Sequence, residues 1–372
     1  MLRPDLIGQR APCDLFNALG VLLVRAGAVI GFSLRHPFRP TRVYCPAEQA
    51  ARISDVNPVA RLGQVGTGLA GIAAQLECGE HVSPAALIDL SRTIHDLWIL
   101  DPDACLGYAR LCRTGRPSIC HVRHVALLTA ELAAAQRLDG AHLINLIGGA
   151  LTMNLAKFAF HDRMHACAGR PGPEEMAEIR AHPEESVRLL RHIGRFDKPW
   201  LDAVAGHHEN VDGSGYPGAL KGTEIALPAR IVRVADAFAA RLTGRRTRRP
   251  LHWNIQRTRA ARNVVQHVFG NDQPLLDPAL ATQLVAALGR FAPGTLVRLN
   301  NGELAVVARR IPGGWAPPRE VLAIRDAHGQ PLATPRRRRI GYGEYDIRTY
   351  ANDESQHFPP AYEWQRVWGY GD

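Results

Sequence analysis

The chain has 372 residues, which suggests two or three compact units, because domains usually contain roughly 100–200 residues. Apolar residues make up 46% of the chain. This is enough for a sizeable core and excludes a wholly disordered protein. Lys and Arg number 45 against 35 Asp and Glu, which gives a formal net charge of +10. The positive charge favours an anionic partner, but it does not distinguish a nucleotide from nucleic acid or a membrane surface.

The seven cysteines are scattered and form no CxxC pair, so neither a disulfide framework nor a zinc ribbon is indicated. A reducing cytoplasm fits this pattern best. The N-terminus has no basic region followed by an apolar run and a small-residue cleavage site. The apolar stretch from Leu15 to Phe32 is interrupted by Arg25 and by glycines, and it is too short to span a bilayer. We therefore expect a soluble, cytoplasmic protein without a membrane partner.

Short strands are expected near the N-terminus. The run DLFNALGVLLVRAGAVI places Gly20 between two β-rich segments, which is typical of a hairpin. A polar, glycine-containing stretch follows from roughly Pro46 to Gly79. Residues 1–80 are therefore predicted to form a β-rich module.

Helical patterning begins near Ser83, which is a good N-cap residue. Apolar stripes at helical spacing follow, one beginning at His121 and another at Leu143. The sequence thus predicts a helical domain over residues 83–290, with several histidines on its inward faces.

The pattern changes again near Pro293. The run PGTLVRLNNGELAVVARR alternates apolar and polar residues around Asn301-Gly302, which is a strong hairpin signal. The last residues are rich in Tyr, Trp and Pro without periodicity. Residues 291–372 are therefore expected to form a β hairpin module with an aromatic tail of unassigned structure. The predicted fold class is mainly α, a helical bundle flanked by small β modules.

The densest polar motif is HHENVDGSGYPG, from His207 to Gly218. Neutral imidazoles are favoured ligands for Fe, Mn or Zn. Adjacent residues of a regular helix diverge by about 100°, so both histidines reach one ion only where the helix ends. The glycines of DGSGYP allow such an ending. The alternative is an interfacial histidine followed by a turn.

HHE followed by DGSGYP is the distinguishing motif of HD-GYP proteins, a branch of the HD metal-dependent phosphohydrolases that hydrolyse the bacterial messenger cyclic di-GMP. The chain resembles this family from roughly Asp101 to Pro250. The segments RPSICHVRHVA, EEMAEIRAHPEES and LPARIVRVADAF resemble its other motifs in order. The resemblance implies an HD-type helical bundle and the following metal ligands: His121, His182, His207, His208 and Asp236.

The chain departs from the family at the name-giving pair. The family segment LLHDiGK aligns with residues 151–157, which puts Met153 and Asn154 at the His and Asp positions and keeps Lys157 as the catalytic lysine. A thioether is a poor ligand for borderline dications. An amide lacks the charge with which a carboxylate bridges two ions. We therefore expect one divalent transition metal ion, Fe or Mn with Zn as the alternative, rather than two or three.

This single ion would be held by three imidazoles, those of His182, His207 and His208. The remaining pair, His121 and Asp236, would then be able to hydrogen-bond to each other. A second His-Asp dipeptide, His161-Asp162, follows the aligned position by eight residues. Eight residues carry a continuous helix about 80° off its original face, so this dipeptide is expected to be a coincidental surface pair.

Arg245 and Arg248 match the positions where the family contacts ligand phosphates, and guanidinium groups bind phosphate bidentately. Gly215, Tyr216 and Pro217 form the GYP part of the expected ligand site.

Three functions remain open. The first is binding of cyclic di-GMP or a related cyclic dinucleotide, with impaired or absent hydrolysis. The second is an active phosphodiesterase with a reduced metal set, in which Lys157 and the arginines stabilise developing charge. The third is a scaffold whose GYP loop docks a protein such as a diguanylate cyclase, with Tyr216 as an exposed aromatic anchor. Nucleic acid is disfavoured because no recognised binding motif accompanies the basic clusters, and a homodimer is left open.

Overall fold

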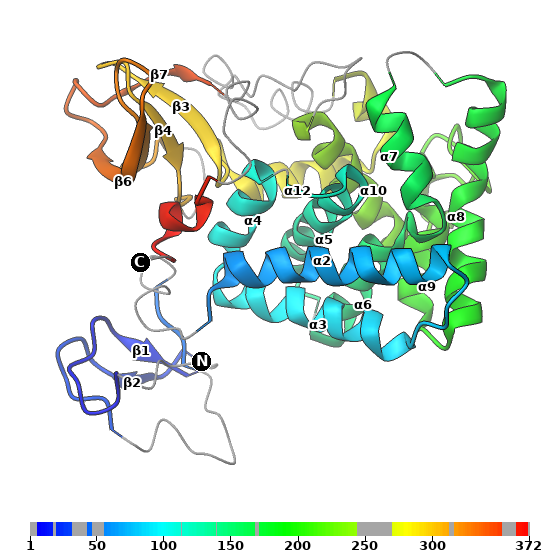
Figure 1. Ribbon diagram of the computed structural model, residues 1–372, viewed down its shortest axis with the longest axis horizontal. Coiled ribbons are helices and arrows are strands. Elements are labelled where there is room, and N and C mark those ends of the chain that lie inside the picture. The colour runs from blue at the N-terminus through cyan, green and yellow to red at the C-terminus, as the bar shows by residue number, and fades with distance from the viewer. Residues whose placement is uncertain are drawn as a thin grey trace.

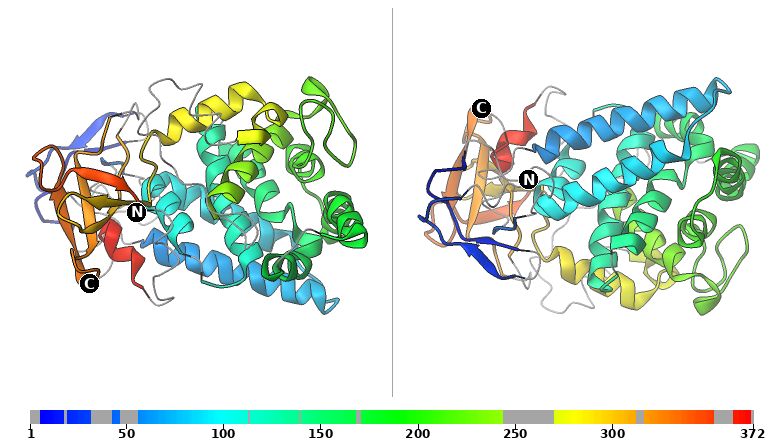
Figure 2. Two further views of the ribbon diagram at one scale, coloured as in Figure 1. Left: turned by 90° about the horizontal axis from the view of Figure 1, so that it is seen from above. Right: turned by 90° about the horizontal axis from the view of Figure 1, so that it is seen from below.

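The computed structural model describes residues 6–17, 20–31, 43–46, 56–112, 114–138, 140–167, 171–243, 270–311, 316–351 and 362–370. Helices form the body of the molecule, and the two β units lie at the end opposite to α7 and α8 (Figures 1 and 2). The predicted fold class, a mainly helical bundle with small flanking β units, is confirmed. The division at residues 1–80, 83–290 and 291–372 stays a prediction.

In chain order the helices are α2 (Pro58–Glu77), α3 (Pro84–Leu100), α4 (Pro102–Leu111), α5 (Pro117–Ala135), α6 (Gly140–Thr152), α7 (Phe158–Ala166), α8 (Pro173–Ile193), α9 (Lys198–Gly206), α10 (Leu227–Thr243) and α12 (Pro278–Leu288). Short 3-10 turns lie between them: η4 (Leu155–Lys157), η5 (Gly222–Glu224) and η6 (Gly270–Leu275). Several of these helices begin with proline, whose fixed φ and missing N–H suit the first helical position.

Helix α2 corrects one prediction. Its residues were expected to be part of a polar stretch ahead of the helices, but Asn57 caps them through hydrogen bonds from the N–H groups of Val59 and Ala60. The glycines that indicated a loop instead allow close packing. A Cβ on Gly66 would lie 3.0 Å from the Arg123 guanidinium. The helical body therefore begins before Ser83.

Helix α5 runs through the centre of the body, and every residue from Val122 to Ala133 is buried. Helices α6 and α10 pack against it. Helix α9 in turn packs on α6, where a Cβ on Gly148 would come within 2.2 Å of the Trp200 ring. The Trp200 indole donates a hydrogen bond of 2.8 Å to Thr152 Oγ1. These contacts fix α9, which leads directly into the two adjacent histidines.

The segment Gly140–Ala166 is long and apolar enough to cross a membrane by length and composition, with a mean hydropathy of 1.4 in its most apolar window. However, 72% of that window is buried inside the protein. The chain also turns within the segment, because α6 ends at Thr152 and α7 begins only at Phe158.

The C-terminal unit is an antiparallel sheet in the order β6-β5-β4-β3-β7. Its strands are β3 (Thr295–Leu299), β4 (Leu304–Val307), β5 (Glu320–Arg325), β6 (Pro331–Arg339) and β7 (Ile347–Tyr350). The hairpin predicted around Asn301-Gly302 is confirmed as the β3–β4 turn. The aromatic tail forms the turn η8 (Trp364–Trp368), whose tryptophans are buried in the second apolar core of the protein.

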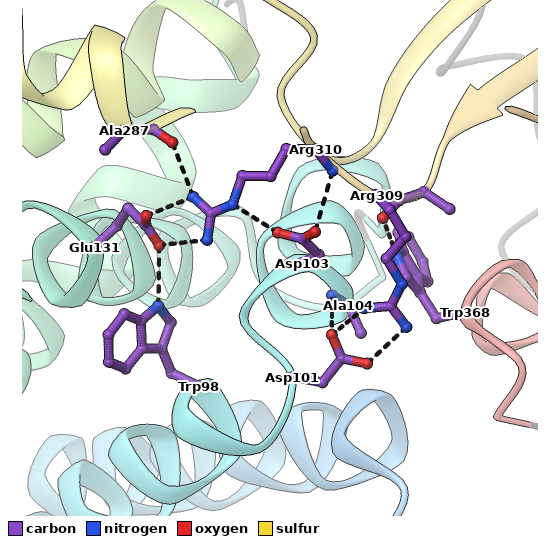
Figure 3. A network of polar contacts seen from close by, with 10 residues as sticks. Trp98, Asp101, Asp103, Ala104, Glu131, Ala287, Arg309, Arg310 and Trp368 are labelled. Atoms are coloured by element: carbon purple, nitrogen blue, oxygen red, sulfur yellow. Dashed lines mark hydrogen bonds and ion pairs between the residues drawn. The ribbon is translucent and has the colours of Figure 1, made fainter. Parts of the chain in front are cut away.

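Buried ion pairs join this sheet to the helices (Figure 3). After β4, Arg309 pairs with Asp101, and Arg310 contacts Asp103 at 2.8 Å and also pairs with Glu131. The carboxylate of Asp101 is completely buried and also accepts a hydrogen bond of 2.9 Å from Tyr370. The arginines that follow β4 thus neutralise buried carboxylates of the helical body, and burying either kind of charge without its partner would be costly.

At the N-terminus, β1 (Leu15–Phe16) and β2 (Leu22–Val24) form the expected hairpin. Gly20 lies in its turn with φ of 76°, a conformation that glycine adopts without strain.

Candidate metal and nucleotide site

His207 and His208 lie where α9 has just ended at Gly206. Gly206 is packed so closely on α10 that a Cβ there would be 2.8 Å from Ala229 Cβ. The two rings lie 4.2 Å apart, centroid to centroid. The expectation that adjacent histidines come together at a helix end therefore holds in the structure.

His182 joins them from α8, and a proline explains its orientation. Pro183 lies inside α8 and has no N–H to donate to the carbonyl of Ile179 four residues earlier. That carbonyl instead accepts a hydrogen bond of 2.6 Å from Nδ1 of His182. Similarly, Nδ1 of His207 donates 2.8 Å to the carbonyl of Val204 in the last turn of α9.

These bonds decide which nitrogens are available for a cation. A carbonyl can only accept, so in the neutral rings Nδ1 carries the proton and Nε2 presents a lone pair. The two Nε2 atoms of His182 and His207 face each other at 3.0 Å. Burial lowers the pKa of His182 to about 4 and, together with the neighbouring His182, that of His207 to about 3. Two unprotonated lone pairs at this distance repel each other unless a cation lies between them.

His208 completes a three-histidine cluster. Its pKa is held well below the ordinary value by burial and by His207. The ligand nitrogens of His182, His207 and His208 all lie within 4.8 Å of one another. Three neutral imidazoles at this spacing suit a divalent transition metal ion, so the residues fit the metal that the sequence motif implies.

The GYP loop closes over this cluster. Tyr216 stacks on His208, with centroids 4.7 Å apart and an interplanar angle of 28°. No residue with a side chain fits in place of Gly215, because a Cβ there would lie 2.3 Å from a backbone nitrogen. Tyr216 was predicted to be an exposed anchor for a partner in the scaffold hypothesis. The structure instead makes this half-buried ring a wall of the histidine cluster.

Glu209 organises the loop, a role that the sequence motif did not reveal. This carboxylate is only 2% exposed and accepts hydrogen bonds from the N–H groups of Gly218 and Leu220, at 2.6 and 3.0 Å. An acidic residue directly before a glycine-rich loop was the available signal, since backbone N–H groups of such loops seek an anion.

His121 and Asp236 form a separate pair. Nε2 of His121 donates a hydrogen bond of 2.7 Å to Oδ1 of Asp236. Burial opposes ionisation of Asp236, but this bond and the positive charge of its neighbours outweigh burial and hold the pKa of the carboxyl well below its usual range. In this structure the facing polar atoms of the two residues are hydrogen-bonded to each other.

The substituted HD pair does not supply ligands equivalent to His and Asp. Met153 is 1% exposed and belongs to the hydrophobic core. Asn154 is buried, and its Oδ1 has no hydrogen-bond partner in the part of the chain that the structure describes. Nζ of Lys157 lies 3.3 Å from carboxylates of both Glu178 and Glu185. Its role in catalysis stays a prediction.

The dipeptide His161-Asp162 corrects another expectation, because it is not a surface pair. The chain turns at Met153 and Asn154 before α7 begins, so the angle calculated for a continuous helix does not apply. The ring of His161 lies 5.1 Å from that of His182. Arg245 and Arg248, predicted to contact phosphate, lie outside the described residues.

Comparison with known proteins finds similarity to the HD domain and to cyclic-dinucleotide phosphodiesterases. Residues 96–262 match the family model of the HD domain, a metal-dependent class. The cyclic di-GMP phosphodiesterase PA4108 of Pseudomonas aeruginosa is 27% identical over 69% of this chain and 56% of its own length. The 3'3'-cGAMP-specific phosphodiesterase 2 of Vibrio cholerae is 32% identical over 34% of this chain and 24% of its own length.

Among solved structures, Bd1817, an HDG"Y"P protein from Bdellovibrio bacteriovorus, aligns at 15% identity with a TM-score of 0.47, covering 76% of this chain and 97% of that chain. The HHE and DGSGYP motifs, the HD-domain match and the phosphodiesterase relatives together support membership of the HD-GYP family. It spans about half the length of the first relative and a quarter of the second.

Proposed function

We propose that the protein binds cyclic di-GMP or a related cyclic dinucleotide in bacterial second-messenger signalling, with impaired or absent hydrolysis. The relatives are named as phosphodiesterases of cyclic di-GMP and of 3'3'-cGAMP, which supports this ligand class. The observation that carries the proposal is the unequal state of the two halves of the site. One half holds three convergent imidazoles, while the other is a closed His121–Asp236 hydrogen bond.

The proposal includes one metal ion, Fe or Mn with Zn as the alternative, held by His182, His207 and His208. A bound ion would supply Lewis acidity toward a phosphodiester. All three ligands are neutral, and the nearby carboxylate of Asp236 is engaged by His121. The single negative charge of Asp236 would offset only part of the charge of a dication, and the remaining positive charge favours binding of an anionic phosphate.

Hydrolysis is expected to be weak because the second half of the site lacks an anionic bridge. Asn154 is neutral, and Met153 is buried in the core. The alternative, an active phosphodiesterase with a single ion, has one feature in its favour, since three histidines around an open position also occur in hydrolytic zinc sites.

The scaffold function receives less support. Its anchor was to be Tyr216, but this ring is stacked on His208. The cytoplasm remains the proposed location, because the seven cysteines, all within the described residues, form no disulfide, as is usual in a reducing compartment.

Calorimetry with cyclic di-GMP and 3'3'-cGAMP tests the proposal, with a hydrolysis assay in Mn²⁺ on the same protein. Arg245→Ala and Arg248→Ala should each weaken binding by roughly 1.5–3 kcal/mol if the lost bonds are charge-assisted. Arg337→Ala is the control, since Arg337 lies on the edge strand β6. This strand is at the end of the molecule opposite to α8, which carries His182 (Figure 1). No binding of either ligand at high micromolar concentration would exclude a sensor. Turnover equal to that of an intact relative would exclude impaired hydrolysis.

A further inference from the structure

We propose that His161 is a positioning residue of the histidine cluster, which holds the ring of His182 in the orientation that a bound ion requires. The inference rests on the metal centre proposed above. It adds a residue that lies outside the ligand set implied by the family resemblance.

The contact between the two rings is specific in geometry. His161 and His182 have centroids 5.1 Å apart and planes at 87°, an edge-to-face arrangement that aromatic rings favour. The contact between His182 and His208 has nearly the same values, 5.1 Å and 88°. His182 is therefore held by two perpendicular rings, one from the cluster and one from α7.

His161 supports the cluster without being one of its ligands. The nitrogens that lie within 4.8 Å of one another belong to His182, His207 and His208. The Nδ1 bond to Ile179 restrains one edge of the His182 ring, but a ring can still tilt about such a bond. The perpendicular contact with His161 opposes this tilt. Outer residues that fix the orientation of a metal-bound histidine, most often through hydrogen bonds, raise metal affinity.

Asp162 keeps His161 in place by fixing α7 to the start of α5. Its carboxylate accepts hydrogen bonds of 2.7 Å from Nε of Arg116 and 2.8 Å from the N–H of Ser118. The N-cap residue of α5, Arg116, makes no side-chain cap of its own, so Asp162 takes this role from another helix, and its charge suits a helix N-terminus. The dipeptide thus links the helix of His121 to the helix of His182.

The test measures binding of Co²⁺ to the full chain by competition with a chelator, together with the visible absorption of the bound ion. His161→Ala should lower the affinity on the order of 10–100-fold and change the absorption spectrum. His161→Phe keeps an aromatic edge against His182 and should retain most of the affinity. His165→Ala is the matched control, because His165 is exposed one turn later on α7 and should bind as the wild type does.

The melting temperature of the metal-free variants separates positioning from folding. If His161→Ala melts earlier but binds Co²⁺ with wild-type affinity and spectrum, His161 only stabilises the fold and the inference is overturned. A loss in His161→Phe as large as in His161→Ala would also overturn it, because the ring nitrogens would then matter. If His161→Ala does not fold, Asp162→Asn replaces it, and unchanged affinity in that variant counts against the inference. Absence of Co²⁺ binding by the wild type would instead refute the metal centre itself.

Discussion

Replacing Arg310 by methionine should destabilise the protein far more than the loss of one ion pair on its surface. The Arg310 side chain is 18% exposed and lies between Asp103, 7% exposed, and Glu131, 10% exposed. Methionine fills most of the space but leaves two buried carboxylates without their cation. Breaking a buried pair in this way costs about 3–5 kcal/mol. Arg337→Met is the control, because its pair with Glu320 is 67% and 36% exposed and should contribute at most about 1 kcal/mol.

The loss of unfolding free energy caused by Arg310→Met should also depend on pH. Burial raises the pKa of Asp103 to about 6 from 3.8, even though Arg310 and Arg309 lower it. Without Arg310 this pKa rises further. A carboxyl whose pKa is higher in the folded state stabilises the protein below its unfolded pKa, and this contribution is lost as the pH rises through the folded pKa. The loss of unfolding free energy should therefore be smaller at pH 5 than at pH 8.

Urea unfolding followed by circular dichroism at both pH values measures these effects. Equal, small losses in Arg310→Met and Arg337→Met would refute the view that the buried pairs hold the sheet to the helices. A large loss of stability in Arg310→Met that does not change with pH would refute the proposed contribution of the raised Asp103 pKa.

Two further predictions concern the metal centre. Restoring the family pair with Met153→His and Asn154→Asp should raise the metal content above about one ion per chain in elemental analysis; unchanged content would mean that the turn after α6 does not direct these side chains to the site. His207→Ala should abolish binding, because two imidazoles hold an ion loosely. Added metal at about 100 times its Kd should then stabilise the wild type by about 2.7 kcal/mol but leave the variant unchanged, and an equal shift in both would place the ion elsewhere.

The histidine cluster was predictable because its signals are local. Adjacent imidazoles before a glycine-rich segment require a helix to end there, and the structure ends α9 at Gly206. His182 could be placed through the family resemblance alone. Its tautomer could have been anticipated, since Pro183 follows it inside a helix and must leave a carbonyl four residues earlier without its usual donor.

Other features depend on tertiary packing that no local pattern encodes. The glycines of α2 indicated a loop, although Gly66 is small because Arg123 of α5 lies against it. His161 was assigned to the wrong face because the calculation assumed an unbroken helix across Asn154. The tail around Trp364 and Trp368 has no periodicity, since its tryptophans complete an apolar core whose other residues include members of α4 and of strands β3, β4 and β5.

The completely buried carboxylate of Asp101 has a consequence for how this protein can be divided. The segment that matches the HD domain stops at residue 262, whereas the cation and the hydroxyl that compensate Asp101 come from Arg309 and Tyr370. The segment that matches the HD domain therefore lacks groups that its own buried charge requires. A fragment cut at the boundary of the match would carry a helical domain with unbalanced interior charge. Mutations in the C-terminal tail should consequently appear, in any screen for nucleotide binding, as losses of folded protein.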